Sequence, residues 1–269
     1  MTEASAATIA AHDIDPASVA TRQEHVQAIE RGLAIIRAFA DASQELTMAD
    51  IAKAVGIPRP TARRFLTTLE TLGYVQSNGR RYRLLPQVLD LGYRHFAAKP
   101  WWPDAQRVAR DFADRTACPC AVAVLDGMSA VYVAYAASHD TAGPPRAIGT
   151  RLPAHASALG HILLSGLDRD DLAHRLRTAD LAAFTDKTMT QPKTLTAAIG
   201  RVRAQGFAFV SGELEIGLAS LGVPVPNRGG DVAAALSVSF AAADGDARID
   251  TLFGPLRQAA QSLTNLLVC

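Results

Sequence analysis

The stretch that begins at Leu46, LTMADIAKAVGIPRPTARRFLTTLETLGYVQSNGRRYRL, limits the possible folds of this 269-residue chain more than any other. Thr47 and Asp50 are typical of a helix N-terminus, because their side chains can bond to the free amides of a first turn. Gly56 can take the left-handed conformation that ends such a helix. Pro60 fits the start of a second helix, where an amide proton has no intrahelical partner. The pattern therefore predicts two helices joined by a tight turn.

The second helix is predicted from Thr61 to Gly73, with one apolar face toward neighbouring helices. That face consists of Ala62, Phe65, Leu66, Leu69 and Leu72. After it, Asn78-Gly79 is the dipeptide preferred in a two-residue hairpin turn, so the flanking residues should form two strands. A third helix is expected over residues 26–39, with Val26, Ile29, Leu33, Ile36 and Phe39 buried. Three helices followed by a hairpin predict a winged helix-turn-helix.

The charge of this segment indicates what kind of molecule it binds. Between Arg59 and Arg83 there are six arginines and one acid, Glu70, in a chain whose formal net charge is only +1. Such a local excess is typical of a surface that contacts phosphates, although a basic face without a partner remains the alternative. In the DNA-binding interpretation the second helix enters the major groove and the hairpin grips the backbone or minor groove. The predicted contacts are Thr47, Arg59, Pro60, Thr61, Arg63, Arg64, Thr67, Arg80 and Arg81.

Length and composition suggest two domains. The content of 49% hydrophobic and 20% charged residues is enough for two packed cores. We find neither an apolar run long enough to span a bilayer nor a signal peptide, and we expect a cytoplasmic protein without membrane association. Three cysteines do not suggest a disulfide framework. The expected organisation is a disordered tail (1–24), the winged helix-turn-helix (25–85), a linker helix (86–100) and a second domain (101–269).

The second domain should be of the α+β class. Strands are predicted over residues 121–125, 130–136, 146–148, 207–211, 221–225 and 232–240, and helices over 104–116, 156–164, 170–177, 194–205 and 249–267. The Trp101-Trp102 pair fits the domain junction, a subunit contact or the second core.

Catalytic and metal-binding arrangements in this domain are weakly supported. Cys118 and Cys120 are separated by one residue, whereas paired zinc-binding cysteines are usually separated by two to four. His155 and Ser157 resemble a base and a nucleophile, but the serine lacks a glycine-framed elbow. No phosphate-binding glycine loop is present. We expect no cofactor and no metal.

A polar pocket is the remaining hypothesis. Ser237 and Ser239 alternate along the strand ALSVS, and SGELEIGLASLGVPV places Glu213, Glu215 and Ser220 near a turn. Hydroxyls on one strand face, opposite a helix that begins near Ser157, would line a small cavity. The alternative is that these serines face solvent.

These motifs resemble the IclR family of bacterial transcription regulators. The resemblance rests on ERGLAIIRAF, the helix-turn-helix stretch and NGRRYRLLPQVLDLG, and on GTRLPAHASALGHILLSGL, GELEIGLASLGVPV and AALSVS in the second domain. It covers residues 26–267 and is most similar to the branch that controls the β-ketoadipate pathway, including protocatechuate and 4-hydroxybenzoate catabolism. Departures are His161, Ser220 and Pro144-Pro145, all expected around the pocket.

The resemblance implies a homodimer or tetramer that binds double-stranded operator DNA through the first domain. It implies a GAF-like second domain with an antiparallel sheet, which binds a small organic acid such as an aromatic acid. The implied effector-binding residues are Ala158, Leu159, Glu213, Leu218, Ser220, Ser237 and Ser239.

Two alternatives stay open. The first is an enzyme that acts on a small organic acid and carries an accessory DNA-binding module, for which His155, Ser157 and Glu213 would have to converge. The second is a constitutive DNA binder with a vestigial pocket.

Overall fold

A computed structural model describes residues 26–39, 45–92, 101–138 and 146–267. The chain divides into two compact units, Met1–Arg94 and His95–Cys269. The expected disordered tail lies outside the described residues, as do Pro144-Pro145 and the second half of the expected linker helix. In its first half the structure has a 3-10 helix, Pro86–Leu91.

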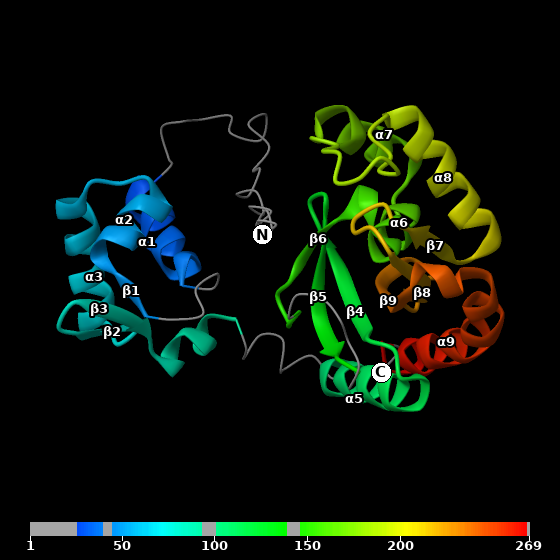
Figure 1. The fold of residues 1–269 in the computed structure, drawn as a ribbon, viewed down its shortest axis with the longest axis horizontal. Coiled ribbons are helices and arrows are strands. Elements are labelled where there is room, and N and C mark those ends of the chain that lie inside the picture. Colours follow the sequence, from blue (N-terminus) through cyan, green and yellow to red (C-terminus); the bar gives the residue numbers. More distant parts are fainter. Residues whose placement is uncertain (1–25, 40–44, 93–100, 139–145, 268–269) are drawn as a thin grey trace, which may run out of the picture. The chain divides into compact units, whose positions relative to one another are not determined.

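The N-terminal unit is the predicted set of three helices and a hairpin, extended by one short strand (Figure 1). The helices are α1 (Gln27–Ala38), α2 (Met48–Val55) and α3 (Arg59–Thr71). The strands are β1 (Leu46–Thr47), β2 (Val75–Asn78) and β3 (Arg81–Leu84), in the antiparallel order β1-β3-β2. The register pairs Asn78 with Arg81, so the two-residue loop is Gly79-Arg80 and not the predicted Asn78-Gly79.

The buried face of α1 differs from the prediction. Ile35 and Phe39 enter the core, whereas Val26, Ile29 and Leu33 are 56%, 63% and 44% exposed. Because this helix has apolar residues on more than one face, its contacts with α2 and α3 decide which face is buried. Leu72 was also predicted to be buried but is 54% exposed, because α3 ends at Thr71 and this residue lies past its last turn.

The C-terminal unit is built on a six-stranded antiparallel sheet in the order β6-β5-β4-β9-β8-β7. The strands are β4 (Cys120–Asp126), β5 (Ser129–Ala136), β6 (Arg151–Pro153), β7 (Ala208–Ser211), β8 (Leu218–Pro226) and β9 (Val232–Ala241). The strand predicted at residues 146–148 is wrong. These residues belong to a loop that is bonded to β5 through Tyr132, and the strand begins at Arg151.

Helices cover both faces of this sheet (Figure 1). One face carries α5 (Trp101–Thr116) and α9 (Gly245–Leu267), which enclose the larger core. The other face carries α6 (Ala158–Ser165), preceded by a 3-10 turn, Ala154–Ala156, and backed by α7 (Arg169–Thr178) and α8 (Pro192–Gln205). The α+β prediction is confirmed.

Trp102 belongs to the core of this unit. Its side chain is buried and its indole nitrogen donates a hydrogen bond to the carbonyl of Val133. Cys120 is fully buried, as predicted for a small core residue. Within the described ranges, no helix is long and apolar enough to span a bilayer.

Candidate functional sites

The outer face of α3 presents the predicted cationic groups. Ala62, Leu66 and Leu69 turn inward, and this leaves Arg59, Pro60, Arg63, Arg64 and Thr67 exposed and Thr61 half-buried. None of the three arginines on this helix forms an ion pair with another described residue. Their guanidinium groups are therefore available to phosphate and base acceptors.

Glu70, the one acid in this segment, is engaged elsewhere. Its Oε1 accepts a hydrogen bond of 2.9 Å from the amide of Ser77, which ties the end of α3 to β2. This carboxylate is thereby turned toward the loop end of strand β2. The excess positive charge of the surface is not neutralised from within.

The hairpin arginines differ from one another. Arg80 occupies the loop at the tip, and no hydrogen bond within the described chain engages its side chain. Arg81 donates to the carbonyl of Glu45, and Arg83 donates to the side-chain oxygen of Gln76 across the hairpin. Arg80 is therefore the more available of the two wing arginines that the sequence singled out.

Thr47 forms the predicted capping box of α2. Its Oγ1 accepts a hydrogen bond from the amide of Asp50, while its own amide donates to Asp50 Oδ2 at 3.0 Å. The hydroxyl proton is also donated to Asp50, at 2.6 Å. Because phosphate oxygens only accept hydrogen bonds, the hydroxyl has no proton left for DNA in this arrangement. The structure gives Thr47 a helix-capping role.

A small cavity of about 30 Å³ lies between α6 and the sheet. All seven residues that the family resemblance implied line it: Ala158, Leu159, Glu213, Leu218, Ser220, Ser237 and Ser239. This volume is close to that of one water molecule and is far below the roughly 300 to 1,000 Å³ of small-molecule sites. Side chains that line the cavity must therefore move before it can hold a small organic molecule.

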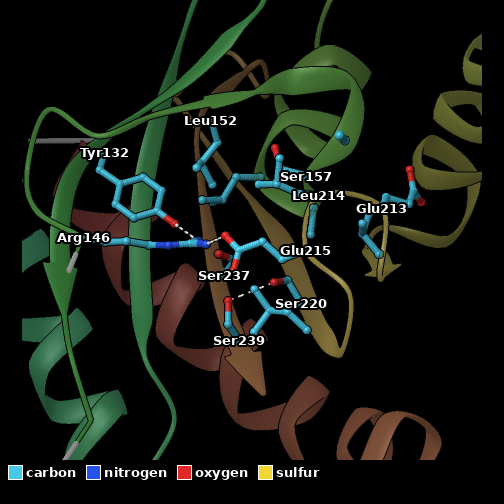
Figure 2. A pocket seen from close by; sticks show the side chains of 15 residues that line it. Tyr132, Arg146, Leu152, Ser157, Glu213, Leu214, Glu215, Ser220, Ser237 and Ser239 are labelled. Carbon is cyan, nitrogen blue, oxygen red and sulfur yellow. Dashed lines mark hydrogen bonds and ion pairs between the residues drawn. The ribbon is translucent and has the colours of Figure 1, made fainter. Parts of the chain in front are cut away.

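Three serines from adjacent strands form the polar floor (Figure 2). The register pairs Ser220 of β8 with Ser239 of β9, and their hydroxyls lie 2.9 Å apart. Ser237 lies two residues before Ser239, so it points to the same face. The predicted alternation therefore places hydroxyls in the cavity instead of in solvent.

An ion pair that the sequence analysis did not identify crosses the cavity. Arg146 bonds to Glu215, and Figure 2 shows both side chains pointing at each other beside the serines. The guanidinium also donates to the hydroxyl oxygen of Tyr132 at 3.4 Å. Burial raises the pKa of Tyr132, so its hydroxyl stays protonated and can itself donate. The site thus combines one cation, one anion and several hydroxyls.

Glu213 lines the same cavity but points away from the ion pair (Figure 2). Its side chain is buried, and its Oε2 has no hydrogen-bond partner among the described residues. Burial raises its pKa to about 7. Of the two glutamates in this turn, Glu215 is the one that meets the cation.

The residues of the enzyme alternative do not converge. Ser157 donates to the carbonyl of Pro153 and accepts from the amide of Gly160, which makes it the cap of α6. His155 bonds to the carbonyl of Ala182, and burial lowers its pKa. In the described segments no histidine activates this serine, and no three metal-binding side chains lie together. His161 is also buried, bonds to the carbonyl of His155 and does not line the cavity.

Comparisons with known proteins identify two domains of one family. Residues 103–265 match the model described as "Bacterial transcriptional regulator IclR C-terminal", and residues 28–79 match the IclR helix-turn-helix domain. The Pca regulon regulatory protein of Pseudomonas putida is 40% identical over 217 residues, which is 80% of this chain and 75% of that protein.

Two solved structures extend the comparison. A putative transcriptional regulator from Rhodococcus sp. RHA1 is 37% identical with a TM-score of 0.77, over 90% of this chain and 98% of that one. The inducer-binding domain of an Acinetobacter PobR double mutant, in complex with 3-hydroxybenzoic acid, is 30% identical with a TM-score of 0.57. That match covers 61% of this chain and 97% of the domain.

Proposed function

Because the chain belongs to the IclR family of bacterial transcriptional regulators, we propose that it controls its target promoters in response to a small aromatic acid. The enzyme alternative loses its support, since relatives across both domains are regulators. The family and the regulator function are therefore established, and the effector and the contact residues are the proposal. As a DNA-binding regulator, the protein would act in the cytoplasm.

The observation that carries the effector proposal is the cavity around Arg146. A buried guanidinium next to Tyr132 and the paired serines matches a ligand with a carboxylate and a ring hydroxyl. The apolar wall formed by Leu152, Leu159 and Leu218 suits the face of a ring. The related PobR domain, which binds 3-hydroxybenzoic acid, supports this class of ligand.

On DNA, we propose that α3 lies in the major groove and that Arg80 follows the backbone from the hairpin tip. A homodimer or tetramer would place two such helices about 34 Å apart, on the two halves of a near-palindromic operator. The exposed apolar residues Val26, Ile29 and Leu33 of α1 support association, because a second subunit would remove them from water. Light scattering of the purified protein measures the number of subunits.

The effector is tested by isothermal titration of the full chain with 3-hydroxybenzoate and 4-hydroxybenzoate. Gel shifts on the DNA upstream of its gene then show whether the bound acid changes operator affinity. Arg146→Gln should weaken acid binding by about tenfold to a hundredfold, because a charged hydrogen bond is lost in a buried site. Acid binding unchanged in this variant would refute the assignment of Arg146.

The DNA surface is tested by single substitutions. Arg63→Ala or Arg64→Ala should weaken operator binding by about 1 to 3 kcal/mol if the side chain contacts a guanine. It should also relax specificity at that base pair. Arg80→Ala should weaken binding to all DNA sequences alike. It should also reduce by about one the slope of log affinity against log salt concentration. Arg177→Ala, which removes an exposed arginine from α7, is the matched control. Unchanged operator binding in all three variants would exclude this surface.

A further inference from the structure

The cavity contains its own carboxylate. Among the described residues that line it, Arg146 is the one cation. Its guanidinium already forms an ion pair with the carboxylate of Glu215. The side chain of Arg146 is 14% exposed and that of Glu215 is 37% exposed, so the guanidinium is largely shielded from water while the carboxylate is partly solvated. An acidic ligand that needs this guanidinium therefore finds the position taken.

Simultaneous binding of the Glu215 carboxylate and a ligand carboxylate to Arg146 is electrostatically unfavourable. A second anion at ion-pair distance would leave the buried site with a net negative charge, and repulsion between like charges is strong where the dielectric constant is low. If Glu215 moves out, the ligand inherits an intact ion pair and the site stays neutral. Exchange of one carboxylate for another is thus the arrangement that electrostatics favours.

We propose that Glu215 is a built-in competitor of the effector, which holds the carboxylate position at Arg146 until an acid displaces it. The inference rests on the proposed function, since it concerns the same pocket. Its consequence is selectivity: an acid regains the contact with Arg146 that Glu215 gives up, whereas a neutral analogue cannot.

The local backbone allows this displacement. Glu215 lies in the turn 212–217, between Gly212 and Gly217, which have φ values of +73° and +83°. Its side chain is 37% exposed and the neighbouring Ile216 is 85% exposed, so the tip of the turn has a short route to solvent.

The base of the same turn is held in place. The hydroxyl of Thr185 bonds to the carbonyl of Gly212 at 2.6 Å, and that of Thr188 bonds to the carbonyl of Glu213 at 2.6 Å. The amide of Gly212 also donates to the carbonyl of Leu218 at 2.8 Å. The carbonyl of Glu215 accepts a hydrogen bond of 3.2 Å from the amide of Leu218, so we expect the Glu215 side chain to move while the backbone of the turn stays anchored.

The test is isothermal titration of the full-length protein and its Glu215→Gln variant with 3-hydroxybenzoate, 4-hydroxybenzoate and the neutral 3-hydroxybenzamide. Glutamine keeps the shape of the side chain and removes its charge. The variant should bind the acids at least about tenfold more tightly, which corresponds to about 1.4 kcal/mol, and the amide within about threefold of the original affinity. Asp114→Asn, on the exposed side of α5, controls for the loss of one negative charge.

Each other outcome has a definite meaning. If the unaltered protein binds an acid and Glu215→Gln binds it equally or more weakly, Glu215 is not a competitor. If Glu215→Gln raises the affinity for the acids and for the amide equally, extra space and not charge explains the result. The inference is then also overturned. If neither protein binds any acid, the acid pocket itself is wrong, and the inference is overturned together with the proposed function.

Discussion

Replacing Glu213 by glutamine should stabilise the protein above about pH 7 and leave its stability nearly unchanged at pH 4. Glu213 as a residue is 9% exposed, its Oε2 has no partner in the described chain, and the pKa of its carboxyl rises from 4.5 to about 7. A raised pKa means that the folded state holds the proton more tightly than the unfolded chain does. The associated stability is complete below the unfolded pKa and is lost as the pH rises through the folded one.

The magnitude follows from the size of that shift. One pKa unit corresponds to about 1.4 kcal/mol, and a change from 4.5 to about 7 sets an upper limit of roughly 3.5 kcal/mol. Residual exposure and rearrangement of the turn reduce this value, so we expect about 2 kcal/mol above pH 8. In a domain of this size that is a rise in Tm of about 4 to 8 °C.

The assay is thermal unfolding of the original protein and Glu213→Gln, monitored by circular dichroism between pH 4 and pH 8.5. The difference in Tm should be close to zero at pH 4, should grow between about pH 4.5 and pH 7, and should level off above that. Asp114→Asn serves as the control for a lost exposed charge. A difference that stays constant across the whole range would refute the reasoning, because it would show that ionisation of Glu213 does not limit stability.

Two further predictions concern local geometry. Thr47→Ala removes the capping box of α2 and should lower the free energy of unfolding by about 1 kcal/mol. The amide of Asp50 should then exchange its hydrogen faster, and an unchanged exchange rate would argue against the cap. Gly160→Ala would place a Cβ 2.2 Å from the backbone of Ala154 and should cost about 3 kcal/mol in urea unfolding. Gly200→Ala on α8, where nothing lies within 4 Å, should be neutral or stabilising, and equal losses in both variants would exclude the close contact.

Sequence reasoning worked best where the signal is local. Caps, turns and apolar spacing depend on residues within one or two turns of the chain, so the helices α2 and α3 and the capping box at Thr47 could be predicted. Alternation along β9 also placed Ser237 and Ser239 on one face, because the side-chain period of a strand is two. Family resemblance supplied the rest of the implied pocket.

The failures arose where more than one arrangement satisfied the local pattern. The apolar residues of α1 fit two faces, and only packing against α2 and α3 decided that Ile35 and Phe39 are buried. The hairpin loop was displaced by one residue because strand register is set by pairing along the whole hairpin.

What the amino-acid sequence determined by itself is the DNA-binding unit: two helices, a hairpin and an unbalanced set of arginines follow from short-range rules. What only the tertiary structure decided is the character of the effector site. Arg146 and Glu215 are 69 residues apart, and each lies in a loop without periodicity. Antiparallel pairing of β5 with β6 and of β7 with β8 positions the two loops, and no local pattern encodes that meeting.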